Sequence, residues 1–188
     1  MNRYDYRYED YAVNLPTEVY ISGFRDTRRF LEYCKQCKNY GAVWACPPFE
    51  HDTTEELKKY SNVIIIATKI IPEIKNLPFS EANHLLRPER LRIERKLRDM
   101  EKENEGKSFA FAGDCLYCPD GKCQRMKGRA CLHPDLVRPS LEAYGFDLEK
   151  TASELFGFPI LWSRNQSIPE YLTLISGFFH NSGNLIFK

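Results

Sequence analysis

Hydrophobic positions along the chain alternate between strand-like runs and helix-like stripes. The clearest run is Val63–Ala67, whose nearly continuous β-branched residues are typical of a strand that is covered on both faces. Residues 1–16 are rich in tyrosine, aspartate and arginine and predict an irregular arm. Short strands are expected at 18–21, 108–112, 158–162 and 171–175. The last two predict an antiparallel pair at one edge of a sheet.

Helical patterns lie between these strands, at 26–37, 52–60, 80–106, 140–144 and 147–156. Thr53 and Glu56 form a capping-box pattern at the start of the second helix. Pro88 predicts an internal boundary or a kink in the third and longest helix. The buried stripe of that helix is expected to contain Leu86, Ile93, Leu97 and Met100. This order predicts an α/β or α+β fold, a mixed sheet with flanking helices and two metal-binding cysteine loops.

Length and charge narrow the class of protein. The 188 residues predict a single domain, 1–188, with cysteine-rich loops at about 34–49 and 113–134. A net charge of +1 argues against a dedicated binder of nucleic acid or of a membrane surface. The N-terminus has no apolar segment typical of a secretory signal, and Val63–Ala67 is far too short to span a bilayer. We therefore expect a cytoplasmic protein.

All seven cysteines fall into two sets. The first cysteine set is Cys34, Cys37 and Cys46. The second cysteine set is Cys115, Cys118, Cys123 and Cys131. Clustered cysteines in a reducing compartment are more often metal ligands or redox groups than disulfides, and an odd number fits disulfides poorly.

The second cysteine set brings four thiols together within 17 residues, in the order C-x2-C-x4-C-x7-C. The segment has too little apolar content to fold by burial, and its glycines at 113, 121 and 128 supply the dihedrals that wrapping a metal centre requires. Four thiolates match either a zinc ion or an iron–sulfur cluster. Irregular spacing and the Cys118-Pro119 pair favour a [4Fe-4S] cluster, with zinc as the alternative.

The first cysteine set has only three thiols, which leaves one coordination position open for a substrate, a small ligand or another residue. His51 is either the fourth ligand or an exposed residue that leads into the next helix. A further option is that one thiol is buried without a metal, as a small hydrophobic group.

Four other residues are candidates for the cofactor environment. Tyr40 and Trp44 either pack over the first site or form the wall of a ligand pocket. His133 is either an extra ligand or hydrogen-bond donor to a sulfur, or a packing residue of its loop. Arg138 either binds an anion or carboxylate ligand, or forms a surface ion pair.

The spacing of these residues is similar to that of a known family. The first block reads Cys34-x2-Cys37-x2-Tyr40-Gly41-x2-Trp44-x-Cys46-Pro47-Pro48. The second reads Cys115-x2-Cys118-x4-Cys123-x7-Cys131-x-His133-Pro134, followed by Arg138-Pro139-Ser140-Leu141-Glu142-Ala143-x-Gly145. Together they resemble the prokaryotic DUF2284 family of predicted metal-binding proteins over about Cys34 to Leu148, with Phe146 where an isoleucine is expected. The resemblance implies metal binding in a cysteine-rich cytoplasmic protein and implies no particular reaction.

Three functions compete at this point. In the first, a [4Fe-4S] cluster on the second set relays electrons and the first set holds a second metal or cluster. In the second, zinc only stabilises the loops of a binding module. In the third, an enzyme binds its substrate at the three-cysteine metal, although no acid–base pair, nucleophile motif or phosphate-binding loop supports catalysis, so enzymatic activity stays open. The expected partners are a redox protein or a small-molecule ligand.

Overall fold

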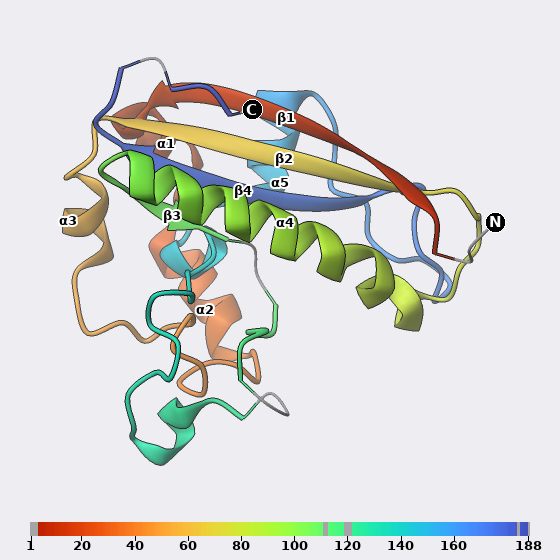
Figure 1. Cartoon of the computed structure of the whole chain (residues 1–188), viewed down its shortest axis with the longest axis horizontal. Coiled ribbons are helices and arrows are strands. Elements are labelled where there is room, and N and C mark those ends of the chain that lie inside the picture. The colour runs from red at the N-terminus through yellow and green to blue at the C-terminus, as the bar shows by residue number, and fades with distance from the viewer. Residues whose placement is uncertain (1–3, 111–112, 119–121, 184, 188) are drawn as a thin grey trace.

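The computed structural model of the chain describes residues 4–110, 113–118, 122–183 and 185–187. Within these residues, four strands form one sheet whose order is β1 (Tyr6–Pro16), β2 (Asn62–Pro72), β4 (Leu172–His180) and β3 (Gly106–Phe109). Every neighbouring pair of these strands is antiparallel (Figure 1). The fold is therefore α+β. The sequence predicted a mixed sheet, but the sheet is antiparallel.

The central strand β2 is covered on both faces, as its sequence predicts. Val63 and Ile65 point into one apolar core, whereas Ile64 and Ile66 point into the other. All four side chains are almost completely buried. The strand is longer than the predicted Val63–Ala67, because both of its edges pair with long neighbours.

The N-terminal part of the chain differs from the sequence prediction. Residues 6–16 are not an irregular arm, because they form the edge strand β1, which pairs with β2 along its whole length. The strand expected at 18–21 is helix α1 (Thr17–Phe24) instead. Tyr20 and Phe24 are one helical turn apart and both are buried, so burial of this face outweighs the β-propensity of the neighbouring residues.

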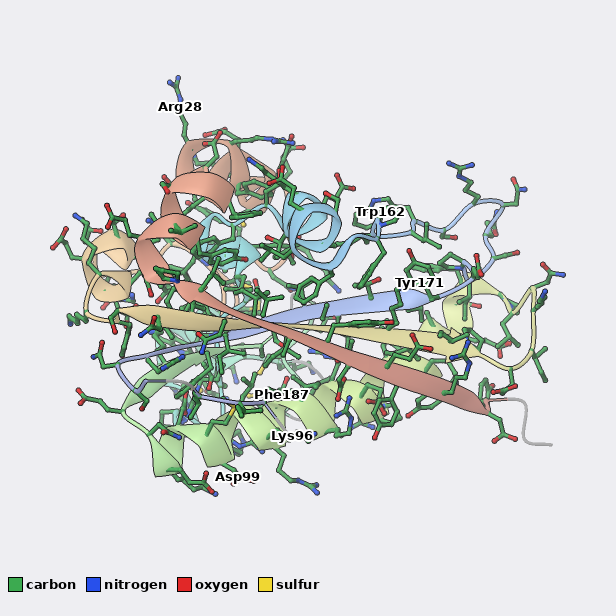
Figure 2. All side chains as sticks on the ribbon, turned by 90° about the horizontal axis from the view of Figure 1, so that it is seen from above. Arg28, Lys96, Asp99, Trp162, Tyr171 and Phe187 are labelled. Atoms are coloured by element: carbon green, nitrogen blue, oxygen red, sulfur yellow. The ribbon has the colours of Figure 1, made fainter. Side chains whose placement is uncertain are left out.

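Helices cover both faces of the sheet, as the view from above shows (Figure 2). Helix α4 (Ala82–Glu103) packs on one face of the sheet through Ile93 and Leu97, so the predicted stripe is confirmed at these two residues. Leu86 and Met100 are only partly buried. Pro88 lies within the helix. Helices α1 and α5 (Leu148–Phe156) pack on the other face, together with most of the aromatic core.

Three smaller helical predictions are confirmed with shifted ends. Helix α2 (Thr27–Lys35) begins at the cap Asp26, and α3 (Thr53–Leu57) begins at the cap Asp52 rather than in the Thr53/Glu56 box. The helix expected at 140–144 is the short 3-10 turn η4 (Glu142–Tyr144). Two further 3-10 turns are η1 (Phe79–Glu81) and η3 (Gln124–Lys127).

The expected strand at 158–162 is wrong, and it does not pair with 171–175. Phe158 packs into the core, whereas Trp162 is 66% exposed and donates a hydrogen bond to Glu149. Strand β4 instead lies between β2 and β3. The strand expected at 108–112 is β3, which ends at Phe109, and residues 111–112 lie outside the described part of the chain.

Beyond the sheet, the two cysteine segments extend together from one side of the molecule (Figure 1). The first follows α2, and the second follows β3 and returns to η4. In the part of the chain that the structure describes, no helix combines the length and apolar character needed to cross a bilayer.

Candidate metal centre

Short turns position the first cysteine set. Cys34 lies in the last turn of α2, and the N–H of Cys37 donates to its carbonyl at 2.9 Å. The chain then reverses at Gly41, whose φ of 67° lies in the left-handed region that favours glycine. The N–H of Gly41 donates to the Pro47 carbonyl at 2.8 Å and closes the loop, which returns Cys46 to the other two thiols.

The three thiols of the first cysteine set line one cavity of about 270 Å³. Tyr40 and Arg138, both expected near a cofactor, line the same cavity. Tyr40 thus lies at the wall of the site. The Arg138 guanidinium donates from Nε to a Glu101 oxygen at 2.8 Å and from Nη2 to the other oxygen, so it forms an ion pair as well as lining the cavity.

Three residues of the second cysteine set, Cys115, Cys118 and Cys123, line a neighbouring cavity of about 330 Å³. Cys123 is buried and precedes η3, which ends at Gly128 with a left-handed φ of 64°. The chain then reaches Cys131, whose sulfur accepts a hydrogen bond from the His133 N–H at 3.4 Å. The sequence interval between the third and fourth thiols is therefore a compact turn.

The thiols within each set lie close enough to affect one another electrostatically. Burial raises the pKa of Cys46 to about 11, and the charges of Cys37 and Cys34 act in the same direction. Burial also raises the pKa of Cys115, an effect that a backbone hydrogen bond opposes and that the other three thiols of its set reinforce. A bound cation would relieve this mutual repulsion and displace the thiol protons.

Polar contacts join the two cysteine loops directly. The Arg125 guanidinium donates to the carbonyls of Val43 at 2.9 Å and Cys46 at 2.6 Å, and also to that of Pro48. It lies 4.9 Å from the centre of the Trp44 ring. Asn39 lines both cavities, so the two sites share a wall.

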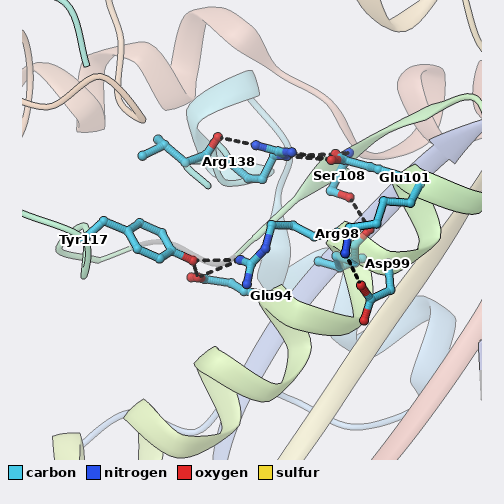
Figure 3. A network of polar contacts seen from close by, with 10 residues as sticks. Glu94, Arg98, Asp99, Glu101, Ser108, Tyr117 and Arg138 are labelled. Atoms are coloured by element: carbon cyan, nitrogen blue, oxygen red, sulfur yellow. Dashed lines mark hydrogen bonds and ion pairs between the residues drawn. The ribbon is translucent and has the colours of Figure 1, made fainter. Parts of the chain in front are cut away.

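Helix α4 supports the second loop with a charged face. Figure 3 shows Glu94 and Arg98 at the hydroxyl of Tyr117, and Glu101 at Arg138. One turn earlier, Arg90 donates to the Asp114 carbonyl at 2.7 Å. These helix residues follow each other at intervals of three or four, so they share one side of α4, which is next to the side that contacts the sheet.

Two residues considered as metal or cofactor neighbours, Trp44 and His51, lie outside the lining of both thiol cavities, whereas His133 contacts the Cys131 sulfur through its backbone N–H. Trp44 is outside both cavities, and its Nε1–H donates to the Arg129 carbonyl at 3.0 Å. The His133 ring lies beside Tyr117 rather than in either cavity. His51 is placed 3.0 Å from the Tyr144 hydroxyl and 3.0 Å from a Glu56 oxygen, and it lines a different cavity from the three thiols.

Sequence reasoning missed several residues that shape the site. Glu142 lines the first cavity, and burial raises the pKa of its carboxyl, with a further contribution from Asp147. Its only sequence signal was its place in the block from Arg138 to Gly145. The roles of Arg125 and Asn39 had no signal in their spacing, whereas the charged face of α4 was readable from the three-to-four-residue interval of its acids and arginines.

The donor atoms fit a thiophilic metal, since soft thiolates in sets of three and four suit zinc, iron or an iron–sulfur cluster. All seven cysteines are free thiols. Among the described residues, no group of three or more histidine, cysteine or acidic side chains is already arranged to hold a metal ion. The thiols are thus gathered around cavities, and binding of a metal requires their side chains to converge further.

Comparison with known proteins gives one match. A family model described as "Predicted metal-binding protein (DUF2284)" matches residues 20–177, which include both cysteine sets and both cavities. No curated protein and no solved structure matches the chain.

Proposed function

The chain belongs to the DUF2284 family of predicted metal-binding proteins, and from this premise we propose that it is an iron–sulfur protein of the cytoplasm that transfers electrons. The second cysteine set would hold a [4Fe-4S] cluster, and the first would hold a second metal or cluster. Bound there, such clusters supply one-electron redox chemistry. The electron would come from a reduced partner protein and leave to an oxidised partner or ligand.

The observation that carries this proposal is the cavity of about 330 Å³ that Cys115, Cys118 and Cys123 line, with Cys131 near enough to contribute to the raised pKa of Cys115. A water molecule occupies about 30 Å³ in the liquid, so this space greatly exceeds the need of one ion. The shared wall at Asn39 further supports electron transfer, because it keeps the second site next to the first. Free thiols in both sets agree with a reducing compartment.

A zinc-stabilised binding module is the second candidate. It is favoured by the loops themselves, which have few apolar contacts and would gain order from any thiophilic ion. In that case the metal would order the two loops without redox chemistry, and binding would use the cavity surfaces.

Anaerobic purification with analysis of iron, acid-labile sulfide and zinc distinguishes the two. The iron–sulfur proposal expects a brown protein whose visible absorption bleaches with dithionite. Cys123→Ser should remove the cluster of the second set, and Cys37→Ser should leave that cluster in place. A colourless protein with stoichiometric zinc and no sulfide would refute the electron-transfer proposal and support the binding module.

A further inference from the structure

The first cavity combines apolar walls with a concentrated group of acidic donors. Phe30, Tyr33, Tyr40, Ala45 and Pro47 provide most of the apolar lining. The three residues of the first cysteine set and Glu142 line the same space. All four of these groups become anionic when they lose a proton, so the cavity is suited to a cation.

The described residues that line this cavity offer no uncommitted positive charge. Arg138 is the single cation among them, and its guanidinium is engaged by both oxygens of Glu101. Arg125 lies near Cys46, but its N–H groups donate to three backbone carbonyls of the first loop. If these groups lost their protons, the cavity would hold a carboxylate and three thiolates, and a cation from outside the chain would have to balance their charge.

Glu142 is held in place by its own turn. It begins η4, where the Ser140 hydroxyl accepts a hydrogen bond from the Ala143 N–H at 3.1 Å. The carbonyl of Gly145 accepts from the Asp26 N–H at 2.8 Å, which fixes η4 against the start of α2. The opposite end of α2 carries Cys34, and the charge of Glu142 reaches that thiol strongly enough to contribute to its raised pKa, after burial.

The Glu142 carboxylate has no competing partner in the described part of the chain, since none of its contacts there is a hydrogen bond or ion pair. His51, the other conceivable fourth donor, is already engaged by Tyr144 and Glu56 and lines another cavity. Glu142 thus differs from His51 because it lines the cavity of the three thiols, although His51 is much closer to Cys46 in the sequence.

We propose that Glu142 completes the first metal site, where its carboxylate oxygen is the fourth ligand to a cation held by Cys34, Cys37 and Cys46. The inference rests on the proposed metal function and specifies the ligand set of one site. A carboxylate oxygen is a harder donor than a thiolate, so it binds a thiophilic metal less firmly. It is thus the ligand that a small molecule in the cavity would replace.

Cobalt(II) titration of the metal-free full-length protein tests this assignment, because thiolate-to-cobalt absorption reports the number of sulfur ligands. Glu142→Gln should weaken cobalt binding at the first site by at least tenfold. Mutation of residues that only support a metal ligand already lowers metal affinity by about tenfold or more. Glu142→Cys should restore tight binding and increase the thiolate-to-cobalt absorption, as expected for a change from three sulfur ligands to four. Glu149→Gln, an exposed acid on α5, is the matched control and should bind like the wild type.

The outcomes separate this proposal from the proposed function. Unchanged affinity and spectrum in Glu142→Gln, with binding lost in Cys37→Ser, would refute the role of Glu142 alone. Loss of the site in His51→Ala, with Glu142→Gln unaffected, would likewise refute it and assign the position to His51. Absence of cobalt, zinc and iron binding in the wild type would refute the metal function itself. If Glu142→Gln fails to fold, the gain of sulfur ligation in Glu142→Cys still decides the question.

Discussion

Replacing Gly145 with alanine should destabilise the protein by about 2 to 5 kcal/mol. Gly145 has a φ of +89°, and a Cβ there would lie 2.7 Å from Thr27 Cα, 2.9 Å from Thr27 Cγ2 and 3.0 Å from Thr27 N. The left-handed conformation costs an alanine about 1 to 2 kcal/mol, and overpacking typically costs a further 1 to 3 kcal/mol. Two of the three contacts are backbone atoms, which no side-chain rotation relieves.

The measurement is urea unfolding of Gly145→Ala beside Gly23→Ala. Gly23 lies in α1, and a Cβ there meets nothing within 4 Å, so its replacement should leave stability unchanged or raise it by up to about 1 kcal/mol. Because Gly145 holds η4 against α2, its variant should also weaken metal binding at the first cysteine set. A Gly145→Ala protein within about 0.5 kcal/mol of the wild type would show that the contact with Thr27 relaxes freely.

Two further changes test other parts of the fold. Arg125→Ala removes the contacts with three carbonyls, so the backbone amides of residues 43–46 should exchange hydrogen at least tenfold faster. Arg129→Ala should not change their exchange. Equal exchange in both variants would contradict the link between the loops. Burial raises the pKa of Asp10, but hydrogen bonds from Arg92 outweigh it and place the pKa below the ordinary 3.8. The stability that this pair contributes is thus present above pH 3.8, and it is lost as the pH falls through the lower pKa that Asp10 has in the folded protein. In urea unfolding, the difference in free energy of unfolding between wild type and Asp10→Asn should therefore shrink in acid. A difference that stays constant with pH would refute this role.

The sequence was most informative where burial alone decides the structure. Val63–Ala67 could only be a strand covered on both faces, and Ile93 and Leu97 could only be the inner side of a long helix. Residues 6–16 form an edge strand that the sequence does not predict. An edge strand keeps polar side chains, and its pairing depends on a partner that lies far along the chain. In α1, the β-branched residues predicted a strand, although Tyr20 and Phe24 are spaced by one helical turn and form the buried face of a helix.

Spacing predicts two cysteine sets because each C-x2-C pair keeps its thiols close in any compact turn, and three residues of each set line a separate cavity. The neighbours of the thiols could not be assigned in the same way. The Trp44 ring donates to a backbone carbonyl and is not part of the lining of either cavity, and His133 contacts the Cys131 sulfur through its backbone N–H rather than through its ring. Glu142 is far from Cys34 in sequence and reaches it only because η4 packs on α2.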